Sequence, residues 1–457
     1  MRGRVELPNS AVELPTSICP KASGARRRDA YNSAIVTTPP APPALPDAAD
    51  LLIVPGELIV PRPIPVLPPP PPPPVVIPAT WLLQDGGAVI AFRLLGEVVG
   101  SAPPVEGRWP LVPYGSRRGW EILGRQDADG QWPAGWLTVP EKDGFAGVGT
   151  IPGFRALLEL HWDRELPGMV AARRALFRLL ATDDDPTLLA ELRPAHDDED
   201  LVIQARHRLR EAAAAALAQA GQEHDPRLRG AARRLLDRVA GFLRSPLAVK
   251  PWMRVGNQHV LAADADLPSF HFLQMLSYMP QFRSEHTEFM ERLFTYLTQP
   301  WPRQAPVQQV GAHLVEQPHL VLGDFLATRS DIDGDMPSAL AWLETMARLG
   351  FLERHDGWVR LLDRMLDDRD RRGVWVPPRS VVMPERVPDW VWPSMALTDR
   401  ARTPDVANPS MTGGGAETGM GADSAGHATV LRGPVSLDVT FRLALIARLT
   451  GRTLEYR

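Results

Sequence analysis

Aspartates in turns beside aromatic residues are the side chains of this sequence that could do acid–base chemistry. Two carboxyl groups on either side of a glycosidic bond can hydrolyse it, one as the acid and the other as the base or nucleophile. Asp127, Asp333 and Asp370 are the candidate catalytic residues, and the other turn aspartates are Asp129, Asp331 and Asp335. Aspartate is also common in turns because its side chain bonds to the backbone two residues further on. The alternative to catalysis is therefore a set of turn and helix caps.

The segment Asp331–Asp335 is the densest acidic cluster beside a predicted helix, with carboxylates at alternate positions. This alternation resembles the first half of a calcium-binding loop, which requires Gly at its sixth position and Glu at its twelfth. Met336 and Trp342 stand at those positions, so no calcium site is predicted. Asp335 is instead expected to cap a helix from Met336 to Leu349.

No motif predicts a bound metal or cofactor. His313, Glu316 and His319 could be pictured as metal ligands, but Pro318 keeps them from sharing one helix, and solvated loop residues are the alternative. The single cysteine, Cys19, excludes an intrachain disulfide and a cysteine-rich zinc site. None of the three lysines follows a glycine, which excludes the P-loop of nucleotide hydrolases.

Tryptophans are concentrated near the same turns. The cavity-lining or structural candidates are Trp120, Trp132, Trp136, Trp358 and Trp375. Buried indoles at helix ends are one interpretation, because aromatic side chains supply much of the buried area of a core. A platform that lines a ligand cavity is the other interpretation.

One helix–turn–Trp unit occurs twice. Residues 357–375, GWVRLLDRMLDDRDRRGVW, place apolar residues every three or four positions and end in Asp370-x-x-Gly373-x-Trp375. This spacing predicts an amphipathic helix that is closed by a glycine in the left-handed conformation. Residues 119–132, GWEILGRQDADGQW, end in the same spacing, from Asp127 to Trp132. The repetition indicates an architecture built from repeated units.

The periodicity of the chain from residue 79 onward predicts an all-α domain. Helices are expected over Glu199–Ala220 and Pro226–Leu243, joined by a short connection in which Asp225 is the N-cap, and such a pair forms an antiparallel hairpin. Further helices are expected over Asp266–Met279, Ser284–Leu297 and residues 436–452, where Arg442 and Arg448 lie outside the apolar face. No set of short alternating strands is predicted.

Two segments are expected to lie outside this packing. Residues 1–78 hold 20 of the 48 prolines, including seven in a row from Pro68 to Pro74, which predicts a disordered proline-rich tail. The tail is either a ligand for a proline-recognising partner or a solvated spacer. Within the domain of residues 79–457, a mobile glycine-rich insertion is expected at about residues 400–430.

The composition excludes several classes of partner. The 457 residues are 44% hydrophobic and 23% charged, with a formal net charge of -4, which is typical of a globular chain. That charge supplies no basic field for nucleic acid. No membrane insertion is expected, because no apolar run reaches about 18 residues. With no signal peptide in the sequence, a cytoplasmic location is expected.

The first of the two turns, Gln126-x-x-x-Gly130-x-Trp132, resembles the QW repeat of terpene cyclases and the related turns of protein prenyltransferases. The closing segment SLDVTFRLALIARLTGRTLEY is similar to the C-terminus of uncharacterised bacterial proteins of this kind. The resemblance implies an α/α toroid-like barrel of antiparallel helical hairpins, in which the Gln amide stacks on the indole and ties helix ends together. The second turn departs from the motif, because Arg369 replaces the glutamine.

The catalytic motifs of that superfamily are missing from the sequence. Neither Asp-x-Asp-Asp nor Asp-Asp-x-x-Asp occurs, and no cysteine other than Cys19 could serve the zinc site of prenyltransferases. Binding of a small-molecule or peptide ligand in a central cavity is therefore the first functional expectation. The alternative is a carbohydrate- or isoprenoid-active enzyme that uses a carboxylate pair. A structural or partner-binding protein that uses the proline-rich tail is the third.

Overall fold

The computed structural model describes residues 73–101, 109–139, 147–181, 198–255, 258–300, 306–327, 335–376, 387–391 and 432–457. The chain divides into two compact units, Met1–Pro69 and Pro70–Arg457, and every described residue belongs to the second. The insertion expected at residues 400–430 lies outside the described residues, as does all of the expected tail before residue 73.

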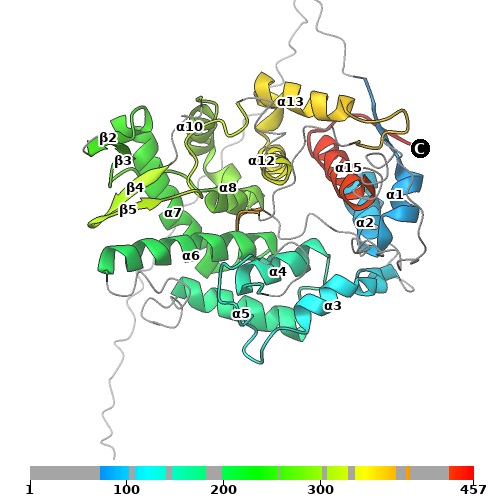
Figure 1. Ribbon diagram of the computed structural model, residues 1–457, viewed down its shortest axis with the longest axis horizontal. Coiled ribbons are helices and arrows are strands. Elements are labelled where there is room, and N and C mark those ends of the chain that lie inside the picture. The colour runs from blue at the N-terminus through cyan, green and yellow to red at the C-terminus, as the bar shows by residue number, and fades with distance from the viewer. Residues whose placement is uncertain are drawn as a thin grey trace, which may run out of the picture. The chain divides into compact units, whose positions relative to one another are not determined.

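The described part of the chain is mostly helical (Figure 1). Its first half contains β1 (Val75–Ile77), α1 (Ala79–Asp85), α2 (Gly87–Arg93), the π-helix η2 (Leu94–Val99), the 3-10 helix η3 (Trp109–Gly115), α3 (Arg117–Leu123), α4 (Thr150–Glu159), α5 (Pro167–Ala181), α6 (Glu199–Gln219), α7 (Pro226–Arg244) and the 3-10 helix η5 (Pro246–Ala248). The second half contains β2 (Trp252–Val255), β3 (Gln258–Leu261), α8 (Phe270–Ser277), α9 (Pro280–Glu285), α10 (Thr287–Leu297), β4 (Val307–Val310), β5 (His313–Glu316), α12 (Met336–Leu349), the 3-10 helix η6 (Leu352–Arg354), α13 (Asp356–Asp367), α15 (Arg432–Leu449) and β6 (Leu454–Tyr456).

Helix ends with clear capping residues lie where the sequence predicts them. The bounds of α6 and α7 match the prediction to within a residue, and the side chain of Asp225 accepts a bond from Arg227 N. Asp335 Oδ1 accepts a bond from Ser338 N at 3.2 Å, so it caps α12 as predicted. A short polar side chain before an apolar period is therefore a reliable helix start in this chain.

Two helices begin later than predicted, because a different residue precedes each. The helix expected from Asp266 is α8, and its N-cap is Ser269, whose hydroxyl accepts a bond from Phe272 N at 3.0 Å. The helix expected from Ser284 is α10, which begins at Thr287, while Ser284 lies inside the short preceding helix α9.

The prediction of an all-α domain is wrong, because two small sheets accompany the helices. One sheet has the strand order β2, β3, β4, β5, and β1 pairs with β6 in the other. Gly256-Asn257 separates β2 from β3, and Gly311-Ala312 separates β4 from β5. Two residues that include a glycine, placed between short runs with β-branched residues, are typical of a β-hairpin. The signal was present in the sequence and was overlooked among the helical periods.

The strands β1 and β6 bring the start and the end of the described chain together. They run parallel, with Val75 opposite Leu454 and Ile77 opposite Tyr456. Val75 and Ile77 are buried. Residues 75–77 belong to the range that was predicted as tail, so the packed unit begins before residue 79.

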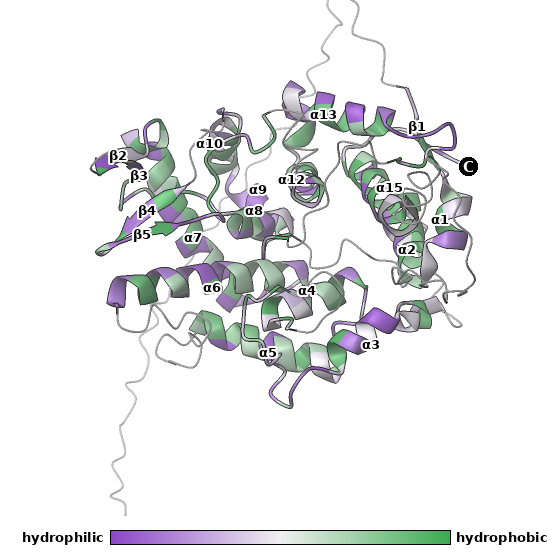
Figure 2. Ribbon diagram, in the orientation of Figure 1, coloured by the Kyte–Doolittle hydropathy of each residue, from purple (hydrophilic) through white to green (hydrophobic). Residues whose placement is uncertain are grey.

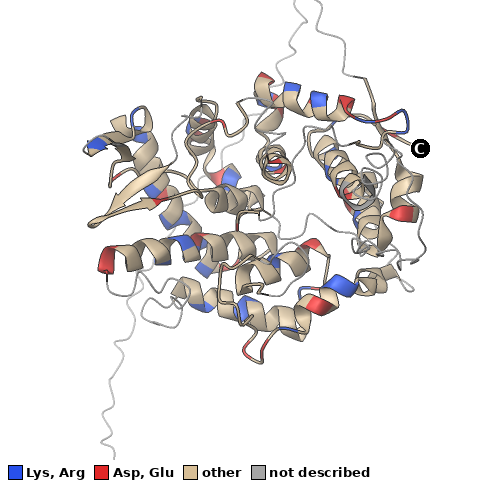
Figure 3. Ribbon diagram, in the orientation of Figure 1, with Lys and Arg blue, Asp and Glu red and all other residues tan. Residues whose placement is uncertain are grey.

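Several helices are buried on nearly every face. Each residue of α8 is buried, and so is each residue of α12 except Arg348. Residues 436–447 of α15 are all buried, and α4 leaves only Leu158 partly accessible. In contrast, α13 buries one stripe and exposes the rest; Figure 2 shows its mixed hydropathy, and Figure 3 shows its basic and acidic residues.

The buried helices pack on one another. α8 contacts α6 and α12, α12 contacts α15, α4 contacts α6, and η2 contacts α15. Any charged residue on such a helix must find its partner inside the protein, because an unpaired buried charge is very unfavourable. This packing therefore determines where the buried charged residues meet. Among the described helices, none is both long and apolar enough to cross a bilayer.

Candidate functional site

The candidate catalytic residues Asp127 and Asp370 cap two equivalent turns. Asp127 Oδ1 accepts bonds from the backbone N–H groups two and four residues further on, at 3.0 and 2.8 Å, and Asp370 Oδ1 does the same at 2.9 and 3.0 Å. Burial raises the pKa of Asp370, but hydrogen bonds from Val374 N–H and from Arg372 outweigh burial and lower that pKa. Asp333 lies outside the described residues. The cap interpretation thus fits both described candidates.

The two turns also share a contact with a threonine hydroxyl. Trp132 N donates to Thr150 Oγ1 at 3.1 Å, and Trp375 N donates to Thr440 Oγ1 at 2.9 Å. Each threonine belongs to a buried helix, α4 or α15. The repeat in the sequence is therefore a repeat of structure, in which one turn fixes the start of the Trp segment on a buried helix.

The residue before each capping aspartate ties its turn to a neighbouring segment. Gln126 Nε2 donates to a carbonyl of its own turn at 3.0 Å and to Gly168 O at 2.9 Å. Arg369 replaces it in the second turn, and its Nη1 donates to a carbonyl of β1 at 2.7 Å. Gly130 and Gly373 have φ of 82° and 86°, the left-handed conformation that was predicted.

Four of the five candidate tryptophans belong to the core: Trp132, Trp136, Trp358 and Trp375 are each 5% exposed or less. The indole Nε1 of Trp358 donates to Asp324 Oδ1 at 2.7 Å. Trp120 differs, since it is 56% exposed and its Nε1 donates to Tyr114 O at 2.8 Å. The packing of the four buried indoles fits the structural interpretation.

The histidines once considered as metal ligands lie in different environments. His313 is exposed on β5 and its Nε2 lies 3.3 Å from Asp198 Oδ2, whereas His319 is buried. Within the described ranges, no group of three or more His, Cys, Asp or Glu side chains is arranged to hold a metal ion.

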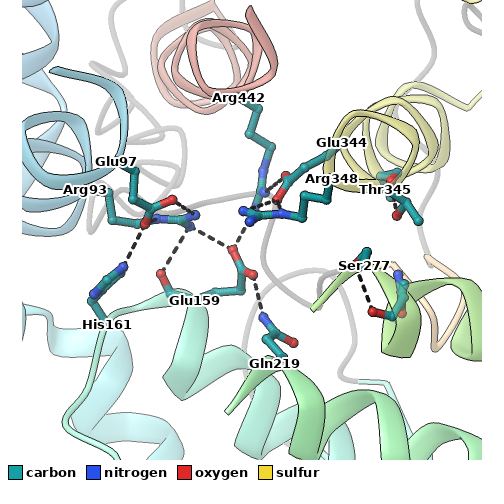
Figure 4. A network of polar contacts seen from close by, with 12 residues as sticks. Arg93, Glu97, Glu159, His161, Gln219, Ser277, Glu344, Thr345, Arg348 and Arg442 are labelled. Atoms are coloured by element: carbon teal, nitrogen blue, oxygen red, sulfur yellow. Dashed lines mark hydrogen bonds and ion pairs between the residues drawn. The ribbon is translucent and has the colours of Figure 1, made fainter. Parts of the chain in front are cut away.

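The main concentration of buried charge lies where the buried helices meet (Figure 4). We call it the interior network; its members are Arg93, Glu97, Arg155, Glu159, Gln219, Glu344, Arg348 and Arg442. They come from α2, η2, α4, α6, α12 and α15. Four guanidinium groups therefore face three carboxylates, an excess of one positive charge within the network.

Ion pairs run through the interior network from a partly exposed end. His161 Nε2 lies 2.7 Å from Glu97 Oε1, and Arg93 donates to the same oxygen at 2.8 Å. Arg93 Nη1 also donates to Glu159 Oε2 at 2.8 Å. Burial raises the pKa of Glu97, but Arg93 and His161 hold it well below its usual range. The charged form of each group is thus fixed by its neighbours.

Glu159 and Glu344 share one cation at the centre of the network. Arg442 Nη2 donates to Glu159 Oε2 at 3.3 Å, and Arg442 Nη1 donates to Glu344 Oε2 at 3.2 Å. Gln219 Nε2 donates to the other oxygen of Glu159 at 2.7 Å, and Arg348 Nη2 lies 2.8 Å from Glu344 Oε1. Burial raises the pKa of Glu159, but Arg93 and Arg442 lower it overall.

Arg155 is the member of the network with an unused donor. Its Nε donates to Gln219 Oε1 at 3.0 Å. Its Nη1 is buried and has no hydrogen-bond partner in the described part of the chain. Burial lowers the pKa of Arg155, while Tyr278 and Glu159 act in the opposite direction. A buried guanidinium N–H without an acceptor is uncommon, because desolvation of the donor is then uncompensated.

Tyr278 and Arg348 lie beside this donor. Arg348 lies over the ring of Tyr278, 4.8 Å from its centroid, and the charge of Arg155 acts on the same phenol. Burial raises the pKa of Tyr278 to about 12, so its hydroxyl stays protonated and can donate. Arg348 keeps 19% of its side chain accessible although the rest of α12 is buried.

A second buried polar group lies around α8. Arg208 Nη2 donates to Asp389 Oδ2 at 2.8 Å, and His271 Nε2 lies 3.4 Å from the same oxygen. Glu211 accepts bonds from Arg238 and from the hydroxyl of Ser269, the cap of α8. This group carries its own carboxylates and cations, and it shares no member with the interior network.

Sequence reasoning missed the interior network. It placed Arg442 on the solvent side of the last helix, yet this residue is 0% exposed. The available signal was a helix with apolar residues on all faces and one isolated charge, a pattern typical of a buried ion pair. Its partners on α4 and α12 are far away in the chain, so the network itself could not be read from local periodicity.

Comparison of the chain with protein-family models, with curated proteins and with solved structures finds no match.

Proposed function

We propose that this chain is a toroid-like binding protein whose interior takes a small anionic molecule with a carboxylate or phosphate group. The observation that carries the proposal is the buried, unpartnered Nη1 of Arg155 in a network with excess positive charge. The α/α-toroid arrangement is part of the proposal. It is supported by the QW-like turn at Gln126, by its counterpart at Arg369, and by the helices that are buried on nearly all faces.

The energetics favour a binding role for Arg155 over a stabilising one. Buried ion pairs are often no more stabilising than apolar side chains of similar size, and a buried donor without an acceptor is unfavourable. A protein gains nothing in stability from such a group, whereas functional sites commonly retain it. An anion at Nη1 would satisfy the donor and neutralise the excess charge.

Three groups could hold the ligand. Arg155 and Arg348 would donate paired N–H bonds to a planar carboxylate or to a phosphate. The hydroxyl of Tyr278 would supply another donor, since its raised pKa of about 12 keeps it protonated. The partial exposure of Arg348 supports access for a small molecule to this part of the protein.

The alternative function is a carbohydrate- or isoprenoid-active enzyme that uses a carboxylate pair. Glu159 and Glu344 are the pair that favours it, because both are buried and both accept from Arg442. A catalytic acid requires a raised pKa, whereas Arg93 and Arg442 lower that of Glu159 against the effect of burial. Binding is therefore the better supported of the two functions.

Thermal unfolding with succinate or pyrophosphate, at constant ionic strength, tests the proposal. A ligand that binds only the folded state raises Tm as its concentration increases. We expect at least one of the two anions to raise the Tm of the wild-type protein and of R292M, which removes an exposed arginine on α10. R155M should keep its Tm without ligand and lose the response, whereas R155K should keep part of it. The proposal is wrong if neither anion acts, or if R155M responds as the wild type does.

Two further parts of the proposal concern the cell. A partner that recognises polyproline would bind the seven prolines from Pro68 to Pro74. The chain would act in the cytoplasm. Fractionation of the producing cells, and capture of the tail by SH3 or WW domains, would test these two points separately.

A further inference from the structure

A cavity of about 210 Å³ lies between α5, α6 and α7, apart from the interior network. Its polar lining consists of His207, Arg210, Arg234 and Arg238, and the described lining residues include no carboxylate. Residues three or four apart share one face of a helix. His207 and Arg210 are three apart on α6, and Arg234 and Arg238 are four apart on α7. Two helices therefore direct cations at one space.

This concentration of positive charge is unfavourable without an anion. Arginines at positions i and i+4 on one helix repel each other. Burial, and then the charge of Arg234, lower the pKa of Arg210. Arg238 is fixed from the other side, because Glu211 accepts its Nη2 and Asp266 lies 3.7 Å from its Nε. In the described part of the chain, Arg234 has no ion-pair partner.

The rest of the cavity wall is apolar and is formed by Leu180, Ala231 and Leu235. The volume is below the range of about 300–1,000 Å³ that is typical of sites for drug-sized ligands. It therefore suits a small molecule that has one charged end and one short apolar end. Guanidinium groups match a phosphate in both geometry and charge.

We propose that this cavity is a second ligand site, which binds a small organic phosphate with its phosphate group on Arg210, Arg234 and Arg238 and its apolar group on Leu180 and Leu235. The site differs from the interior network in its helices and in its residues. It also differs in chemistry, because its described polar lining is entirely cationic, whereas the interior network balances most of its charge internally.

Calorimetric titration with n-butyl phosphate and with inorganic phosphate, at constant ionic strength, tests the site. We expect saturable one-to-one binding, with butyl phosphate binding more tightly because of the apolar wall. R234Q should weaken binding by about tenfold or more, the effect of losing one hydrogen bond to a charged group. R233Q is the matched control, since the neighbouring Arg233 is exposed and does not line the cavity, and it should bind within about twofold of the wild type.

The imidazole of His207 gives a second readout by nuclear magnetic resonance. Burial, and then Arg238, lower its pKa, while Glu211 and Asp266 act in the opposite direction. A bound phosphate beside the ring favours the protonated form, so saturation with butyl phosphate should raise the pKa of His207 in the wild type and in R233Q. A purely structural role for the arginines predicts no such shift.

Four outcomes would overturn the proposal. The first is the absence of saturable binding, and the second is an equal loss in R233Q and R234Q, which would indicate only a general charge effect. The third is an unchanged pKa of His207 at saturation. The last is binding that appears only when Asp183, Asp184 and Asp185 are all replaced by Asn, because the occupant would then be the chain's own acidic segment.

Discussion

Arg442 on α15 donates to Glu159 on α4 at 3.3 Å, which joins two residues that are 283 positions apart in the chain. Both side chains are buried, and Arg442 also bonds to Glu344 on α12. One guanidinium group thus connects three buried helices. This contact fixes how those helices are placed around the interior network, and it carries a direct energetic prediction.

Removal of one partner should be more harmful than removal of both. R442M leaves two buried carboxylates without one of their donors, so we expect it to lower the unfolding free energy by about 3 kcal/mol. E159Q should also destabilise, while the double variant should be more stable than the sum of the single effects by about 0.5–3 kcal/mol. Chemical denaturation of the four proteins measures this coupling. R292M should leave stability unchanged, and strict additivity would show that the pair is not coupled.

Replacement of either threonine that accepts a Trp amide should destabilise the protein. T150V and T440V each leave a buried N–H without an acceptor, and we expect each to lower the unfolding free energy by about 1–3 kcal/mol. Serine at either position should restore most of the loss, since it keeps the hydroxyl. T295V is the control, because Thr295 is exposed on α10. If both valine variants match the control, the hydroxyl contacts do not hold the turns.

Stability should fall as the pH falls below about 6.5, the ordinary value for histidine. Burial, and then the charge of Arg208, lower the pKa of His319 to about 3, with Glu211, His271 and Asp389 also nearby. Between these values the unfolded chain binds a proton that the folded chain does not, so one such group lowers the unfolding free energy by about 1.4 kcal/mol per pH unit. His207, whose pKa is also lowered, adds to the slope.

The contribution of His319 can be separated from that of the buried carboxylates. The pKa values of Glu97, Glu159 and Asp389 are lowered, so they contribute stability above the unfolded value of about 4 and lose it only as the pH falls further. Urea unfolding between about pH 5 and 6.5 should therefore have a smaller pH slope in H319Q than in the wild type. H313Q, at an exposed histidine, should keep the full slope. Equal slopes in all three proteins would show that His319 is not held neutral.

The point of truncation should matter by a few residues. Deletion of residues 1–69 removes only the first compact unit, so Tm should not change. Deletion of residues 1–77 also removes β1, whose Val75 and Ile77 are buried, and should lower stability by about 1.5–3 kcal/mol for each of these side chains. Thermal unfolding of the two truncated proteins measures the difference. Equal Tm values would mean that β1 does not stabilise the packed unit.

Local signals predicted the helices well. The bounds of α6 and α7 follow from apolar periodicity, Asp225 and a first-turn proline, all within a few residues of each other in the sequence. The cap Asp335 and the repeated turns at Asp127 and Asp370 were also predictable, because a turn is determined by its own short sequence. The β-hairpins failed for a different reason: their two-residue links were visible but were outweighed by the surrounding helical periods.

Contacts between distant segments could not be predicted. The pairing of Val75 with Leu454 joins the two ends of the described chain, and no local pattern indicates such a partner. The same holds for the interior network, in which Arg442 looks like a solvent-facing residue until α4 and α12 are placed against its helix. The candidate aspartates were chosen for their turns, whereas the buried charges that matter are glutamates and arginines inside apolar helices.

Native mass spectrometry of the purified wild-type protein and of R155M tests most directly whether the interior binds an anion. We expect the wild type to carry an adduct of constant mass that dissociates as an anion, and R155M to have the mass of the bare chain. Circular dichroism and Tm should show that R155M is folded. A wild-type protein without an adduct, or an adduct that persists in R155M at the same occupancy, would contradict the proposal that Arg155 holds an anionic ligand.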